Sequence, residues 1–127
     1  MSQSAFMSLK AWEKGFKLAC SISKMARANF PPEEKYSLTD QIRRSSRSVC
    51  SNLAEGYAKR CYPKHFKAKI TDAIGEHYET QTWLCFAHEE GYITKEMLDQ
   101  YQRASEEVGK LLSSMASNPE PFLPKRR

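Results

Sequence analysis

Two pairs of cysteine and histidine have the spacing of metal ligands. Cys61 and His65 are separated by three residues, and Cys85 and His88 by two. Thiolate and imidazole groups are ligands that Zn²⁺ prefers in proteins. Both pairs fall on one predicted helix, where a rise of ~1.5 Å per residue places them roughly 36 Å apart. They cannot share one ion within a protomer, so we expect no metal site, although two pairs from different subunits could still meet.

Covalent and acid–base catalysis have weak support. Serines are frequent between residues 45 and 51, but no histidine lies near them in the sequence, and no glycine-rich phosphate loop or nucleophile elbow is present. Glu55, Glu76 and Glu79 are more typical of solvated or ion-paired helical glutamates. His77 lies on an apolar helical stripe, which favours a hydrogen-bonded core histidine. We therefore expect a protein that is not an enzyme and needs no cofactor.

The charge is strongly uneven along the chain, whose net charge is +5. Residues 43–69 carry +7, residues 70–124 carry −7 and residues 125–127 add +3. The basic block could attract phosphate or an acidic partner. Alternatively, the basic and acidic blocks face each other, within the fold or between subunits.

Two groups of basic residues are the candidate nucleic-acid contacts. Arg43 and Arg47 lie one helical turn apart, a like-charge pair that an anion would stabilise. The second group surrounds one helix–helix corner, together with the aromatic residues Tyr57, Tyr62 and Phe66, and this mixture is typical of RNA or single-strand binding. Its members are Lys59, Arg60, Lys64, Lys67 and Lys69. A solvated basic corner without a ligand is an equally common explanation of this pattern. Two local pairings could neutralise part of this charge, Asp40 with Arg44 and Glu55 with Lys59.

The elements that must position these residues are four helices. Apolar residues recur every three or four positions over 9–28, 37–59, 63–90 and 94–115, and Pro31, Pro63 and Gly91 mark boundaries. No segment alternates with period two for long enough to form a strand. Short connections between long helices predict an all-α, antiparallel up-down-up-down four-helix bundle.

The apolar stripes predict the core. The stripe of the third helix is the longest and includes His77. The expected buried positions are Leu9, Trp12, Phe16, Ala19, Ile22 and Ala26; Leu38, Ile42, Val49 and Leu53; Phe66, Ile70, Ala73, His77, Thr80, Leu84 and Ala87; and Leu98, Tyr101, Ser105, Val108, Leu112 and Met115. In the second helix, the serines would let neighbouring backbones approach closely, and Gly56 predicts close packing or an early end of the helix.

We expect one bundle domain over residues 1–116 and a flexible, proline-rich basic tail over 117–127, in which Phe122 and Leu123 could dock on a partner. The N-terminus lacks the apolar region of a signal peptide, and no apolar run is long enough to cross a membrane. These features predict a cytoplasmic protein with reduced thiols and no membrane partner. Cys20, Cys50 and Cys85 are then expected to be half-buried apolar residues.

The second helix resembles the four-helix bundle proteins of the 23S rRNA intervening-sequence family. The matching residues are Gln41-Ile42-Arg43-Arg44 and Ser51-Asn52-Leu53-Ala54-Glu55-Gly56-Tyr57, supported by Leu9, Trp12, Phe30-Pro31, Ala73, Gly75, Glu79 and Gly91-Tyr92-Ile93. The resemblance covers roughly residues 9–115. The chain departs from the family pattern at Glu76, where serine is usual, at Ser45 and Ser46, where alanines are usual, and at Cys50, where proline is common.

The resemblance implies a bacterial cytoplasmic bundle that assembles as a homopentamer, in a family whose molecular role is poorly defined. Some members are encoded within intervening sequences of 23S rRNA genes. Related accessory variability proteins of diversity-generating retroelements are basic pentamers that bind RNA and reverse transcriptase.

The leading hypothesis is therefore a homo-oligomer that binds nucleic acid, with structured RNA as the ligand, through the two basic groups. The main alternative is a protein-interaction scaffold whose arginines contact other subunits or a partner protein. A metal-dependent enzyme is the third interpretation.

Overall fold

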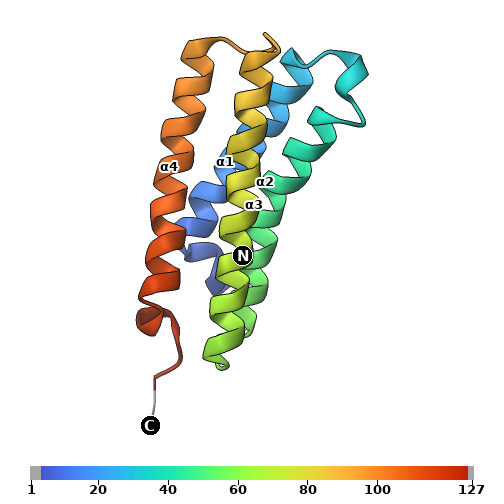
Figure 1. The fold of residues 1–127 in the computed structure, drawn as a ribbon. Coiled ribbons are helices and arrows are strands. Elements are labelled where there is room, and N and C mark those ends of the chain that lie inside the picture. The colour runs from blue at the N-terminus through green and yellow to red at the C-terminus, as the bar shows by residue number, and fades with distance from the viewer. Residues whose placement is uncertain (1–3, 126–127) are drawn as a thin grey trace.

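The fold is a bundle of four helices in a computed structural model that describes residues 4–125. The helices are α1 (Lys10–Asn29), α2 (Leu38–Ala58), α3 (Pro63–Glu89) and α4 (Lys95–Ser117). Three short 3-10 helices accompany them, η1 (Ala5–Ser8), η2 (Pro32–Glu34) and η3 (Glu120–Phe122). Consecutive helices run in opposite directions and are joined at alternate ends of the bundle (Figure 1). The predicted fold class is confirmed, since residues 4–125 contain no strand.

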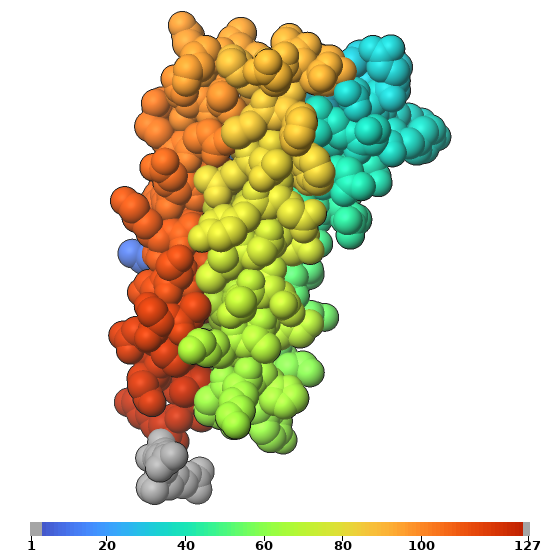
Figure 2. Space-filling model, in the orientation of Figure 1, coloured from blue at the N-terminus to red at the C-terminus, as the bar shows by residue number. Residues whose placement is uncertain are grey.

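The core lies along the axis of the bundle, and α3 contributes its longest stripe. All seven positions predicted for the α3 stripe are buried, from Phe66 to Ala87. The side chain of Phe66 and those of Ile42, Leu53 and Leu112 on the other helices have no exposed surface. Figure 2 shows α3 and α4 side by side across the face toward the viewer.

The predicted stripe of α1 is partly wrong. Ala11, Gly15, Leu18 and Ile22 are buried, whereas 49% of Phe16 is exposed. Small residues face the bundle in the first half of α1 because α2 approaches it closely there: a Cβ atom on Gly15 would lie 3.5 Å from Cys50 Sγ. This close approach leaves no room for the large Phe16 ring on the inner face.

The predicted helix ends agree with their local chemistry. Thr94 Oγ1 accepts a hydrogen bond from the backbone N–H of Met97 at 3.1 Å, so it caps α4. Gly91 has φ +81°, and the N–H of Tyr92 donates to the carbonyl of Ala87 at 2.9 Å to close α3. The Tyr92 hydroxyl then donates to Glu34 Oε2 at 2.7 Å, which ties the α3–α4 connection to η2 at the same end.

The tail contains one short helical turn. Pro119 precedes the single turn of η3, whose geometry proline tolerates, and the Phe122 ring stacks on Phe66 with centroids 6.3 Å apart. Phe122 and Leu123 are half-buried against the core of their own protomer. The basic residues Arg126 and Arg127 lie outside the described residues.

The cysteines also differ in part from expectation. Cys20 and Cys85 are exposed, so the prediction that they are half-buried is wrong, and Cys50 is buried. Among the helices of residues 4–125, none combines the length and the apolar composition that crossing a bilayer requires.

Candidate nucleic-acid interface

The basic corner, defined here as Lys59, Arg60, Lys64 and Lys67, lies where α2 passes into α3. The turn is tight: the N–H of Lys59 donates to Gly56 O at 3.0 Å, and the N–H of Tyr62 donates to Lys59 O at 2.8 Å. Gly56 also permits α2 and α3 to pack closely beside this turn, because a Cβ atom there would lie 3.1 Å from Lys69 Cβ and 3.3 Å from Ile70 Cδ1. The close packing inferred from Gly56 is therefore confirmed.

Three lysines of the basic corner project into solvent. Lys59, Lys64 and Lys67 are exposed, and within residues 4–125 none of them forms an ion pair. Their charges are available to a ligand from outside the protomer.

Arg60 is held in place by its neighbour Tyr57. Its guanidinium lies over the Tyr57 ring, 4.0 Å from the centroid, and Nη1 donates to Tyr57 O at 3.0 Å. A guanidinium has five N–H donors, so this arrangement orients the group and leaves most of them free for an anion.

Lys69, the fifth predicted contact at this end, is engaged within the protomer. Its Nζ atom lies 3.0 Å from Glu55 Oε2, and the hydrogen bond with this carboxylate raises the pKa of Lys69. Glu55 was expected to pair with Lys59, one turn along α2. The structure instead pairs it across the α2–α3 seam, because Gly56 brings the stem of Lys69 against α2.

Arg43 and Arg47 lie apart from the basic corner. About 18 Å of helix separates Arg47 from Lys59. Arg43 Nε donates to Ser23 Oγ on α1 at 3.0 Å and is half-buried, whereas Arg47 is exposed. The expected pairing of Arg44 with Asp40 is not among the ion pairs of residues 4–125, and Arg44 Nη2 donates to Gln41 Oε1 at 3.4 Å. The structure thus divides the predicted contacts into two separate regions.

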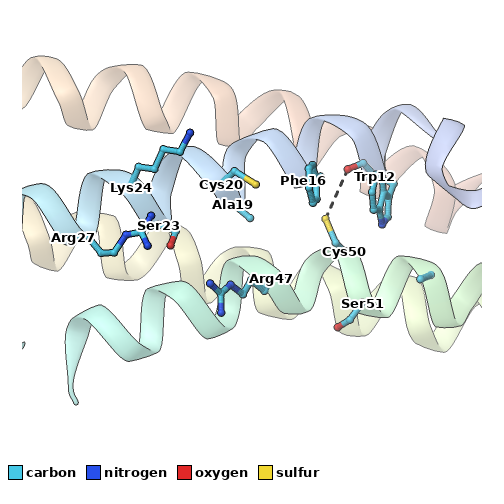
Figure 3. Close-up of a pocket in the computed structure, with 11 residues that line it drawn as sticks. Trp12, Phe16, Ala19, Cys20, Ser23, Lys24, Arg27, Arg47, Cys50 and Ser51 are labelled. Atoms are coloured by element: carbon cyan, nitrogen blue, oxygen red, sulfur yellow. Dashed lines mark hydrogen bonds between the residues drawn. The ribbon is translucent and has the colours of Figure 1, made fainter. Parts of the chain in front are cut away.

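Arg47 belongs to a groove between α1 and α2, which we call the α1–α2 groove. Its volume is about 580 Å³. Figure 3 shows Trp12, Phe16 and Cys50 toward one end, Lys24 and Arg27 toward the other, and Arg47 between them. Described residues that line it include no acidic side chain; they are Trp12, Phe16, Ala19, Cys20, Ser23, Lys24, Arg27, Arg47, Cys50, Ser51 and Ala54.

The side chains that could act in catalysis, His77 and Cys50, are buried in the bundle. The His77 ring is 2% exposed, and its Nε2–H donates to Ser105 O at 2.7 Å, so the expected core histidine is confirmed. Burial lowers the pKa of His77, which keeps the ring neutral. Burial also raises the pKa of the Cys50 thiol to about 12 and makes it a poor nucleophile. No cluster of three potential metal-ligating side chains occurs within residues 4–125.

Glu76 is the one acidic side chain with an unusual environment on α3. Its Oε2 atom is buried and has no hydrogen-bond partner within residues 4–125. Burial raises the pKa of Glu76, the neighbouring Glu79 adds to this effect, and Arg44 opposes it. Trp83 Nε1, on the same face of α3, is likewise buried without a partner, and the neighbouring Phe86 is 52% exposed.

Sequence reasoning missed the α1–α2 groove as a unit. The apolar periodicity predicts both Trp12 and Phe16 on the core stripe, and the sequence pattern gives no role to Lys24. The available signal was the small pair Ala11 and Gly15, which follow the same helical period and mark the face that approaches α2.

Comparisons with known proteins agree with the geometry. A model of the 23S rRNA-intervening sequence protein family matches residues 7–114. A crystal structure from Bacteroides thetaiotaomicron, described as a protein of unknown function from the S23 ribosomal protein family, superposes with a TM-score of 0.77 at 26% identity, covering 85% of this chain and 96% of that chain. No curated protein sequence matches. The chain therefore belongs to the 23S rRNA-intervening sequence protein family.

Proposed function

We propose that this chain is a non-enzymatic, homo-oligomeric bundle that binds structured RNA through the basic corner. The observation that carries the proposal is the exposure of Lys59, Lys64 and Lys67 without ion pairs in residues 4–125. Glu55, the only acidic residue between positions 43 and 69, forms its ion pair with Lys69. The corner therefore carries positive charge that nothing nearby in the sequence neutralises.

The chemistry of the corner suits the RNA backbone. Lysine ammonium groups act as point charges for phosphates, and the oriented Arg60 can donate two parallel hydrogen bonds to one phosphate. Each phosphate neutralised releases counterions, so affinity falls with salt by a slope of roughly 0.7–0.9 per contact on a log–log plot.

A homo-oligomer, which the family resemblance implies to be a pentamer, would repeat this corner on one assembly. The α3 face that carries Phe86 supports subunit contact, because a partner could cover this exposed ring. Repetition of a weak site raises the overall affinity for an RNA that spans several copies.

The test is the affinity for a labelled RNA hairpin, measured by fluorescence anisotropy over a range of salt concentrations. Lys64→Glu with Lys67→Glu should weaken binding at least tenfold and flatten the salt dependence by about two contacts. The control is Arg103→Glu with Lys110→Glu, two exposed cations of α4 whose reversal changes the net charge equally. Equal losses in both variants, or no binding by the unmodified protein at low salt, would contradict the proposal.

The alternative, a protein-interaction scaffold, has one observation of its own. Arg43 already bridges α2 to α1 through Ser23, and Arg47 lies beside it on the open face of these helices. If these arginines serve subunit contacts, Arg43→Ala with Arg47→Ala should reduce the mass measured by light scattering. If they serve RNA, the mass should stay constant while the affinity for the hairpin falls.

A further inference from the structure

We propose that the α1–α2 groove binds unpaired nucleotides, with a base stacked on Phe16 and phosphates held by Lys24, Arg27 and Arg47. The inference rests on the proposed RNA binding and assigns a second site, separate from the basic corner, to a particular form of RNA. Four observations support it: the exposed aromatic face, the cations, their spacing and the volume of the groove.

The aromatic face is built for one-sided stacking. Phe16 lies on Trp12 with ring centroids 5.0 Å apart and an interplanar angle of 10°. Trp12 covers one side of the ring and fixes its orientation, while 49% of Phe16 stays exposed. Aromatic rings presented beside positive charge are the usual platforms for single-stranded nucleic acids, because every base has a π face.

Lys24 and Arg27 lie at the opposite end of the same groove, and Arg47 lies between them and Phe16 (Figure 3). Lys24, Arg27 and Arg47 are exposed, and none is ion-paired in the described part of the chain. Along α1, Lys24 and Arg27 are roughly 12 Å and 17 Å from Phe16. A base on Phe16 therefore cannot place its own phosphate on Arg27, and the groove suits a short run of nucleotides. The volume of about 580 Å³ is in the range of sites that enclose small molecules.

Unpaired RNA fits these features better than a duplex or a second copy of the chain. The bases of a duplex are stacked inside the helix and cannot reach Phe16. A second copy would have to remove three cations from water and supply an acidic partner to each, because uncompensated buried charge is strongly unfavourable. A nucleotide brings an aromatic plane and an anion in one repeating unit, and its phosphate stays partly hydrated.

The experiment compares oligouridylate with a blunt RNA duplex of the same length, using Phe16→Ala and Ala54→Leu. Ala54 lines the groove, so leucine fills it without removing the aromatic pair. Both variants should bind oligouridylate about tenfold more weakly and the duplex within twofold of the unmodified protein. The matched control is Tyr78→Ala, which removes an exposed ring from α3 and should leave both affinities unchanged.

Three outcomes would overturn the inference. Unchanged oligouridylate affinity in both variants would show that the groove takes no base. If Lys64→Glu with Lys67→Glu still weakened RNA binding in that case, the proposed function of the basic corner would stand without the groove. A change of mass in light scattering for Phe16→Ala would show that the groove is a subunit contact. Failure of the unmodified protein to bind either RNA would remove the proposed function as well.

Discussion

Helix α2 packs against α3 on one side and against α1 on the other, and we call these two helix–helix contacts its seams. Both seams contain small residues of α2, but they differ in how completely they close. On the α3 side the seam is closed: Gly56 lies against Lys69 and Ile70, and the hydroxyl groups of Ser45 and Thr80 hydrogen-bond at 2.8 Å. On the α1 side only the inner edge is closed. The outer edge opens into the α1–α2 groove.

The difference shows that small residues alone do not determine whether two helices close. Opposite Gly56, large side chains from α3, Phe66 and Ile70, fill the seam and are completely buried. Along the outer edge of the α1 side, α1 offers the small residues Ala19 and Cys20 and turns Phe16 outward, so volume is left open. The closed seam ends in a corner where exposed cations surround the exposed Tyr62 ring, whereas the open seam combines charge with an apolar groove.

Two substitutions on α2, at positions two residues apart, test whether the α3 seam is packed more tightly than the α1 seam. Gly56→Val should lower the free energy of unfolding by about 2–3 kcal/mol, because its side chain would clash with Lys69 and Ile70. Ala54→Leu should cost less than about 1.5 kcal/mol, since its side chain enters the groove. Urea unfolding measures both values.

Gly75→Ala is the control for the glycine substitution. No atom lies within 4 Å of a Cβ built at Gly75, so alanine there should stabilise α3 by up to about 1 kcal/mol. Similar losses for Gly56→Val and Ala54→Leu would mean that the two seams are equally tight.

The sequence predicts the closed seam well and the open one poorly. The α3 stripe and Gly56 are local patterns, and the structure confirms both of them. In α1, two helical stripes share Ala19, Ile22 and Ala26, and one includes Phe16 while the other includes Gly15. Only the approach of α2 decides between them, and that approach is a tertiary property.

The same reason explains the other differences. The Glu55–Lys69 pair joins two helices, whereas the expected partner Lys59 was chosen by spacing along one helix. Phe122 stacks on Phe66, a contact between distant positions in the chain. Whether the basic residues contact RNA is a property of a ligand that the sequence does not contain, so the assignment of Lys59, Arg60, Lys64, Lys67, Lys69, Arg43 and Arg47 stays a prediction.

The closed interior should make the stability depend on pH through the buried His77. His77 is neutral in the folded protein because burial lowers its pKa, so the unfolded chain binds the extra proton below pH ~6.5. Stability is therefore fully present above that pH and falls as the pH drops toward the lowered folded pKa, by at most about 1.4 kcal/mol per pH unit.

Urea unfolding at pH 7.5, 6.5 and 5.5 measures this slope. His77→Gln should flatten it, and substitution of the exposed His65 should leave it unchanged. An equal slope in His77→Gln would show that other groups cause the pH dependence.

The hydrogen bond across the closed seam should give a smaller effect. Ser45→Ala removes the partner of Thr80, which keeps its bond to Glu76 O at 3.0 Å, so we expect a loss of about 1 kcal/mol. Ser48→Ala on the solvent side of α2 removes only a local bond to Arg44 O and should change stability by less than about 0.5 kcal/mol. Equal effects of the two alanines would show that the Ser45–Thr80 bond adds nothing to the seam.

The four cysteines allow one measurement that tests the central claim, RNA binding at the basic corner. Cys61 lies at the basic corner, Cys20 lines the groove, and Cys85 is exposed beside α4, where Gln102 Nε2 donates to its sulfur at 3.5 Å. Alkylation rates of each thiol, followed by mass spectrometry, can be compared with and without a bound RNA hairpin that carries an unpaired loop. Cys50 is the internal reference, since burial and a pKa of about 12 keep it unreactive.

We predict that RNA slows the alkylation of Cys61 at the corner and of Cys20 in the groove, and leaves Cys85 unchanged. Slowing of Cys61 alone would keep the corner and remove the groove from the binding surface. Bound RNA with no change at Cys61 would contradict the central claim.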